Sequence, residues 1–154
     1  MSAVIVSLRV KATPHEAFAV FTEEIGAWWR ASELFQLTPR GDGALRFDNQ
    51  ERLVSTLPNG KEFEIGRVSE WRPGERLAFT WRQASFAPDQ STQVTVSFEA
   101  IGEETRVTVE HRGWDAIPQE HVARHGFPLQ VFQMRQAEHW RAVLASMAQR
   151  LGCD

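Results

Sequence analysis

Apolar and polar residues alternate along several short stretches of the chain, a pattern that predicts strands with one face in a core. The first stretch covers residues 4–10, and the others follow one another between residues 44 and 111. Turn signals separate the later stretches, at Pro58-Asn59-Gly60, Arg72-Pro73-Gly74-Glu75 and Gly102-Glu103. The pattern predicts one strand and, after it, a meander of about six antiparallel strands.

The alternation changes phase once inside this meander. Phe63 and Ile65 share one parity, whereas Val68 has the other, and Gly66 lies between them. Because one extra residue in a strand switches its faces, we predict a β-bulge at this glycine.

Three further stretches carry helical signals. Thr13-Pro14-His15-Glu16 is a capping box with proline at the first helical position. Thr22 is the expected cap of a second short helix, and a long helix is predicted over residues 129–150. Since strands and helices are segregated along the chain, we predict an α+β fold in a single domain over residues 1–154.

Composition narrows the class of protein. The chain has 154 residues, 42% of them hydrophobic, and a net charge of −3 at pH 7. Nucleic-acid binding needs a dense basic face, a membrane span needs about 20 apolar residues, and a secretory signal needs a basic start and an apolar run. None of these is present, and the single cysteine, Cys153, excludes an internal disulfide framework. We therefore expect a soluble, cytoplasmic protein without a nucleic-acid partner or a membrane span.

Sequence landmarks at the element ends resemble one known family. They are Thr13-Pro14, the pair Trp28-Trp29, the stretch WRPGERLAFTW at residues 71–81, Arg112-Gly113-Trp114, and Trp140 in the long helix. With them, residues 4–150 resemble the homologues of the activator of the 90-kDa heat-shock-protein ATPase, within the START and birch-pollen-allergen-like (SRPBCC) superfamily. His139 departs from the family, which usually has glycine before the helix tryptophan.

The resemblance implies a helix-grip fold. In that fold a curved antiparallel sheet, here of about seven strands, wraps around a long C-terminal helix, with two short helices after the first strand and a cavity between sheet and helix. It also implies a binding protein for a small apolar or aromatic molecule, such as a lipid or an aromatic compound. A chaperone partner and a role in stress response follow from the family name alone, so a co-chaperone-type interaction module is kept as an alternative.

The long helix has a polar break in its inward stripe. The stripe is apolar from Trp140 onward but carries Gln133 and Gln136 before it. A buried amide without a partner costs about 1–3 kcal/mol, so these glutamines line a wet cavity, meet partners or face solvent. We favour the cavity, where they would orient a mostly apolar ligand by its carbonyl or hydroxyl group.

His111 shares the parity of Val107 and Val109 and is expected to point into the same interior. Either it is a satisfied histidine at the end of the sheet, or it contacts a ligand or transfers a proton near neutral pH. The proton-transfer role defines a second alternative, a cyclase- or hydrolase-like enzyme that uses His111. The chain has no tyrosine and no nucleophile motif, so we favour a binding protein without catalytic residues.

His121 and His125 have the spacing of two metal ligands on a helix, with Glu120 beside them. No third ligand is evident, and Gly126-Phe127-Pro128 indicates a loop. We therefore predict neither a metal nor a cofactor.

The predicted ligand-lining set joins the polar groups to aromatic residues at core-type positions: Trp28, Trp29, Phe47, Phe79, Trp81, Phe98, His111, Gln133, Gln136 and Trp140. Each aromatic member also has an ordinary explanation as core packing. Which of the two adjacent tryptophans faces inward stays open, because neighbouring positions can point to different sides.

Overall fold

A computed structural model of the chain describes residues 3–29, 44–57, 59–82, 90–114, 117, 124 and 127–151. Within these residues the order of elements is β1 (Ala3–Val10), α1 (Pro14–Glu23), α2 (Ile25–Trp28), β2 (Ala44–Asp48), β3 (Arg52–Thr56), β4 (Glu62–Arg72), β5 (Arg76–Trp81), β6 (Thr92–Ile101), β7 (Glu104–Arg112) and α3 (Leu129–Arg150).

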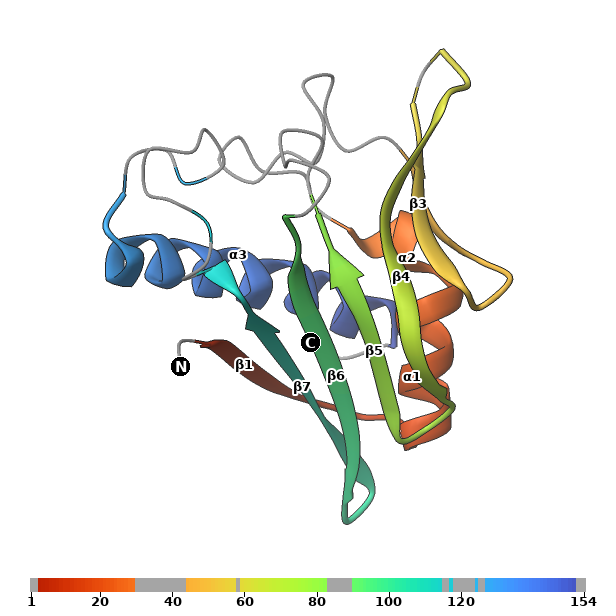
Figure 1. Ribbon diagram of the computed structural model, residues 1–154. Coiled ribbons are helices and arrows are strands. Elements are labelled where there is room, and N and C mark those ends of the chain that lie inside the picture. Colours follow the sequence, from red (N-terminus) through yellow and green to blue (C-terminus); the bar gives the residue numbers. More distant parts are fainter. Residues whose placement is uncertain are drawn as a thin grey trace.

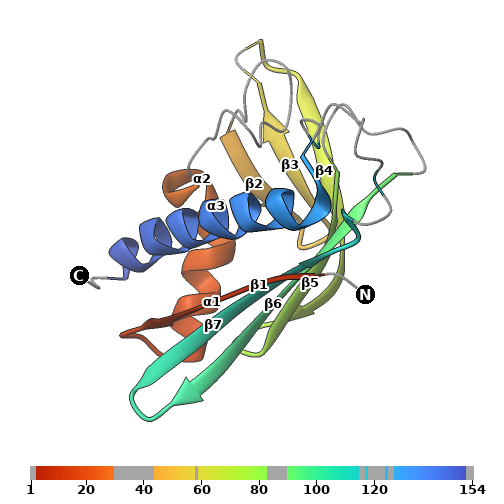
Figure 2. The same ribbon diagram turned by 90° about the vertical axis from the view of Figure 1, so that its left-hand side faces the viewer.

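The strands form one antiparallel sheet in the order β1-β7-β6-β5-β4-β3-β2. Strands β2 to β7 are a meander in which each strand pairs with the next, and β1 joins its end by pairing with β7. The sheet curves around α3, as the two perpendicular views show (Figure 1, Figure 2). The expected α+β helix-grip arrangement, with two short helices after the first strand, is confirmed.

The predicted bulge at Gly66 is present and bends β4. Leu53 pairs with Gly66 whereas Val54 pairs with Glu64, so Ile65 is the extra residue. A Cβ atom at Gly66 would lie 1.6 Å from the carbonyl oxygen of Thr80. Only glycine therefore allows the backbone of β5 to approach so closely.

The first helix begins as predicted. Thr13 accepts from the backbone N–H of Glu16 at 3.1 Å, and the Glu16 carboxylate accepts from the N–H of Thr13 at 3.0 Å. The prediction for Thr22 is wrong, because α1 continues past it and its hydroxyl donates to the carbonyl of Phe18 at 2.9 Å. A threonine hydroxyl can cap a helix or bond one turn back within it, and the sequence alone did not distinguish the two.

Helix α3 crosses the inner side of the curved sheet and has α1 and α2 beside its C-terminal half (Figure 2). Arg150 donates to Glu24 at 3.0 Å, which ties the end of α3 to the residue that precedes α2. The side of α3 that faces the core carries Phe132, Gln136, Trp140, Val143, Leu144 and Met147. Searched over the described residues, the helices include none with the length and apolar character to cross a membrane.

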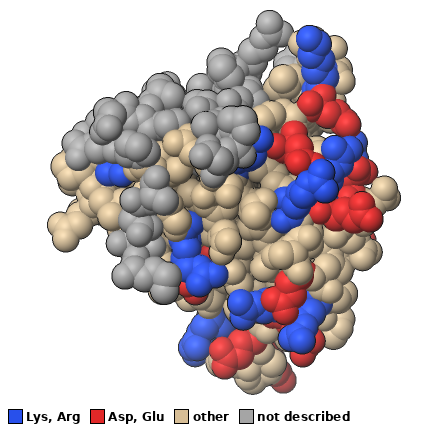
Figure 3. All heavy atoms as spheres, in the orientation of Figure 1, with Lys and Arg blue, Asp and Glu red and all other residues tan. Residues whose placement is uncertain are grey.

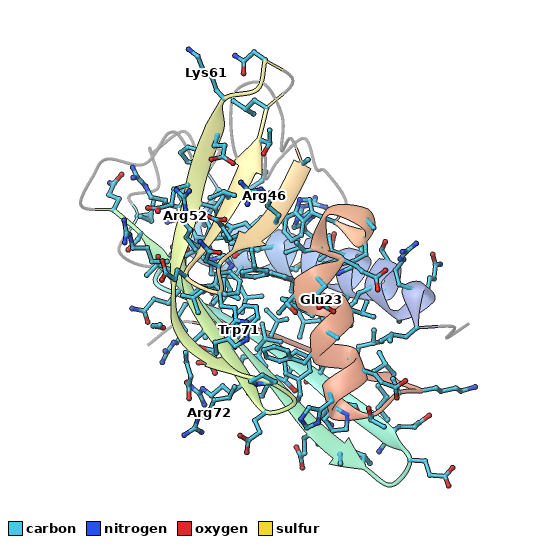
Figure 4. All side chains as sticks on the ribbon, turned by 90° about the vertical axis from the view of Figure 1, so that its right-hand side faces the viewer. Glu23, Arg46, Arg52, Lys61, Trp71 and Arg72 are labelled. Carbon is cyan, nitrogen blue, oxygen red and sulfur yellow. The ribbon has the colours of Figure 1, made fainter. Side chains whose placement is uncertain are left out.

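Charged side chains of both signs alternate across β2, β3 and β4. Arg46 pairs with Asp48 and Glu62, and Arg52 pairs with Asp48, Glu62 and Glu64. Figure 4 shows Arg46 and Arg52 on neighbouring strands, and Figure 3 shows basic and acidic atoms intermixed on the face that it presents. This part of the surface therefore consists of paired charges rather than a patch of one sign.

Candidate functional site

The groups that surround His111 lie at the same end of three neighbouring strands. Trp81 is the last residue of β5, Thr92 is the first of β6, and the register pairs these two residues with each other. His111 lies near the end of β7, opposite Val94. Because α3 crosses the sheet here, it brings Trp140 onto the imidazole of His111.

A chain of hydrogen bonds fixes His111 in one state. The indole N–H of Trp140 donates to His111 Nδ1 at 3.2 Å, so Nδ1 carries no proton. The neutral ring then has its proton on Nε2, which donates to Thr92 Oγ1 at 2.7 Å. The Thr92 hydroxyl donates in turn to the carbonyl of Trp81 at 3.0 Å. Both ring nitrogens therefore have partners within the protein, as expected for a satisfied histidine at the end of the sheet.

The surroundings keep this histidine uncharged. His111 is fully buried, and burial lowers its pKa from 6.5 to about 3, with a smaller lowering from nearby His139. Burial also lowers the pKa of His139 to about 4. A general base needs a free acceptor nitrogen, whereas Nδ1 of His111 is already occupied by Trp140. The geometry suits a structural role better than proton transfer.

The two adjacent tryptophans both reach the interior, on different sides. Trp28 is 1% exposed, packs on Phe21 of α1 and donates its indole N–H to the carbonyl of Val20 at 3.0 Å. Trp29 is half-buried and packs against Trp81 and Trp140, with ring centroids 5.5 and 5.8 Å away. Trp29 is thus the member of the pair that faces the site around His111.

The polar break in α3 coincides with a division of the apolar core. Trp140 belongs to the main cluster, whereas Phe132 belongs to a second one with Trp114 and Ile117. Gln136 lies one turn from each of Phe132 and Trp140 and on the same side of the helix, so it separates the two clusters. On the inward side of α3 the polar break is therefore the single residue Gln136, because Phe132 is buried one turn before it and Gln133 is only half-buried.

Both glutamines have an amide atom without a partner. Gln136 is 3% exposed, and among the described residues nothing bonds to its Oε1. The same holds for Nε2 of the half-buried Gln133. Buried amides are normally satisfied, so one unmet acceptor and one unmet donor on neighbouring turns mark a place where a polar partner would be favourable.

The other predicted ligand-lining residues are spread along the core. Phe79 packs between Phe47 and Trp81, with centroids 5.5 and 6.3 Å away. Phe98 packs on Phe21 of α1 and lies six residues along β6 from Thr92, which is about 20 Å of strand. The structure therefore gathers Trp29, Trp81, His111 and Trp140, with Gln136 one helical turn from Trp140. It places Phe98 and Trp28 beside α1.

Sequence reasoning missed four residues at this end of the fold: Thr92, Trp114, Phe132 and Arg124. The spacing of Phe132, at four and eight residues before Gln136 and Trp140, could have revealed its place on the inward side of α3. Thr92 and Arg124 had no such signal, because their roles depend on contacts between distant segments.

Several sequence predictions fall outside the described residues, namely those for His121, His125 and Cys153. Within the described part of the chain, no three histidine, cysteine, aspartate or glutamate residues are grouped so that they could hold a metal ion.

A family model decides the relationship that the landmarks suggested. The model for Activator of Hsp90 ATPase homolog 1-like protein matches residues 11–152. The chain belongs to this family. No curated protein sequence matches it.

Solved structures agree with the family at the level of the fold. CalC from Micromonospora echinospora, described as a self-sacrificing resistance protein, is 26% identical with a TM-score of 0.65, over 97% of this chain and 93% of CalC. The Aha1 dimer from Colwellia psychrerythraea is 17% identical with a TM-score of 0.60, over 98% and 96% of the two chains. An AHSA1 protein from Silicibacter pomeroyi is 16% identical with a TM-score of 0.60, over 98% of each chain.

Proposed function

We propose that this family member binds a small, mainly apolar or aromatic molecule between α3 and the strand ends of β5, β6 and β7. The observation that carries the proposal is Gln136, which is 3% exposed and has an unmet carbonyl acceptor between two apolar clusters. A ligand with a donor group would satisfy that atom while its apolar part lies against the neighbouring rings.

The aromatic rings around Trp140, which lies one helical turn from Gln136, supply the apolar contact. Trp29, Trp81 and Trp140 pack mutually with centroids 5.5 to 6.1 Å apart. Burying apolar ligand surface on such rings contributes about 25 cal/mol per Å². Gln133 offers an unmet donor one turn away, so a ligand with a carbonyl or hydroxyl group would be held in one orientation.

In this proposal His111 supports the site rather than reacting in it. Its imidazole holds Trp140 through Nδ1 and Thr92 through Nε2, and so fixes one wall. Since both nitrogens are engaged, a cyclase- or hydrolase-like reaction that uses His111 as a base would first have to break its bond to Trp140. Binding without catalysis requires no such change.

Native mass spectrometry of the protein as purified tests the proposal. We expect a stoichiometric small-molecule adduct that disappears on denaturing extraction, which would also give the class of ligand. The Gln136→Leu variant should lose most of the adduct, because its amide is the orienting group. Gln149→Leu, which alters an exposed glutamine of the same helix, should retain it.

Two results would contradict the proposal. The first is equal adduct occupancy in Gln136→Leu and Gln149→Leu. The second is a wild-type protein without an adduct that also fails to bind N-phenyl-1-naphthylamine, a neutral apolar aromatic probe, in a fluorescence titration.

A co-chaperone-type interaction module is a second candidate, and surface residues favour it. Val131 and Met134 are 39% and 61% exposed and lie three residues apart on α3, and adjoining apolar side chains at the surface can mark a contact with another protein. A pull-down with an ATPase chaperone at micromolar concentration tests this candidate. Retention that Met134→Gln abolishes would support it, and no retention of the wild type would exclude it.

A further inference from the structure

Arg124 is a buried cation that has no acidic partner in the described part of the chain. The residue is 4% exposed, and no aspartate or glutamate among the described residues forms an ion pair with it. An ionised group removed from water is unfavourable unless it is paired or fully hydrogen-bonded. The position of this guanidinium therefore requires an explanation.

Two backbone carbonyls account for part of it. Arg124 Nη1 donates to the carbonyl of Ile117 at 2.8 Å, and Nη2 donates to that of Phe127 at 2.7 Å. The third nitrogen, Nε, is also buried and has no acceptor among the described residues. The carbonyls hold the guanidinium in place, but they are neutral, and within the described residues its charge has no acidic counterpart and its Nε has no acceptor.

The guanidinium lies beside the second apolar cluster, which contains Phe132 and Trp114. Its Cζ is 5.4 Å from the ring centroid of Phe132, which packs on Trp114 at 4.6 Å. The ring centroids of Trp114 and His111 are 5.5 Å apart, and Phe132 is one helical turn from Gln136. A charged donor, a neutral amide and an aromatic wall therefore follow one another along the inner side of α3.

We propose that Arg124 binds an oxyanion group on the ligand, so that the ligand is an amphipathic acid with an apolar or aromatic body. This inference rests on the proposed function and adds the ligand's charge to it. The oxyanion would accept from Nε and neutralise the guanidinium, which carboxylate-like groups match in geometry. The body of the ligand would then extend past Phe132 toward Gln136 and Trp140.

A matched pair of fluorescent probes tests the charge directly. The first is 8-anilino-1-naphthalenesulfonate, and the second is N-phenyl-1-naphthylamine, which has the same aromatic skeleton without the sulfonate. We expect the wild-type protein to bind the sulfonate at least about tenfold more tightly, as a charge-assisted hydrogen bond implies. Equal affinity for the two probes would overturn the inference.

Substitution locates the effect at Arg124. In Arg124→Met we expect the sulfonate to bind about tenfold more weakly, while the neutral probe keeps its affinity within about twofold. Arg135→Met is the matched control, because it removes one positive charge from a 54% exposed side chain on α3; neither probe should change. An unchanged sulfonate affinity in a folded Arg124→Met variant would also overturn the inference.

A measurement on the wild type covers the case in which the variant does not fold. The Nε–H resonance of Arg124, assigned through its own side-chain carbons, should shift on addition of the sulfonate and stay in place with the neutral probe. The same response to both probes, or none to either, contradicts the inference. Binding of the neutral probe without a preference for the sulfonate contradicts this inference alone, whereas binding of neither contradicts the proposed function as well.

Discussion

Trp140 donates its indole N–H to Nδ1 of His111 across 3.2 Å, at a point where the two side chains are 2% and 0% exposed. This one contact joins the long helix to the last strand of the meander. It also settles the tautomer of the histidine, because an indole nitrogen can only donate. The bond therefore explains why a buried imidazole is compatible with the core of this family member.

The contact predicts a specific loss of stability. His111→Ala leaves the buried indole N–H without an acceptor and opens a space in the core, so the free energy of unfolding should fall by about 3 kcal/mol or more. Trp140→Phe removes the indole donor, so its loss of the hydrogen bond should lower the free energy of unfolding by less than His111→Ala does. The double variant should lose less than the sum of the two, because it has no stranded donor. Urea denaturation measures all three, and strict additivity would contradict the role given to the bond.

The buried histidines predict acid sensitivity in a defined range. Burial lowers the pKa of His111 to about 3 and that of His139 to about 4, whereas both would titrate near 6.5 in the unfolded chain. Between these values the unfolded state binds more protons than the folded one. The contribution of the two neutral histidines to the free energy of unfolding is therefore fully present above pH 6.5 and is lost as the pH falls toward 3. For His111 this loss is about 1 kcal/mol between pH 7 and 5.5.

Unfolding free energies at pH 7 and 5.5 test this dependence. His139→Gln should reduce the slope with pH, and His111→Gln should reduce it further whatever its effect on stability at pH 7. A slope that neither variant changes would assign the acid sensitivity to other groups.

The unmet amide of Gln136 predicts a trade of function for stability. Gln136→Leu replaces a buried polar group with an apolar one of similar size, so the ligand-free protein should gain about 1 kcal/mol in unfolding free energy. Thermal or urea unfolding of ligand-free protein measures this gain, and Gln149→Leu at an exposed position should stay within about 0.5 kcal/mol of the wild type. A loss of stability in Gln136→Leu would mean that the amide already has a partner.

The bulge in β4 predicts an unusually sensitive glycine. Gly66→Ala would place a Cβ atom 1.6 Å from the Thr80 carbonyl oxygen, so we expect a loss of more than about 4 kcal/mol or no folded protein. Gly102→Ala is the comparison, because Gly102 has a φ of +62° but open space around it, and should cost about 1 kcal/mol. Expression level and circular dichroism separate the two outcomes, and similar behaviour of the two variants would contradict the steric argument.

Local signals in the sequence were sufficient where a local interaction had only one candidate partner. The capping box at Thr13 and Glu16 depends on residues three apart, and the phase change at Gly66 depends on the period of one strand. The prediction for Thr22 failed because a hydroxyl has two local partners of similar quality, and the continuation of α1 decided between them.

The sequence by itself determined most of the elements, their segregation, the fold family and the glutamine at position 136 on the inward side of α3, because periodicity and short motifs encode all of these. Only the tertiary structure decided that Trp29 faces the site, that Gln136 separates two apolar clusters, and that Trp140 and Thr92 occupy both nitrogens of His111. The contact between Trp140 and His111 joins residues 29 positions apart. Such pairs meet only when the sheet curves around the helix, so no local pattern records them.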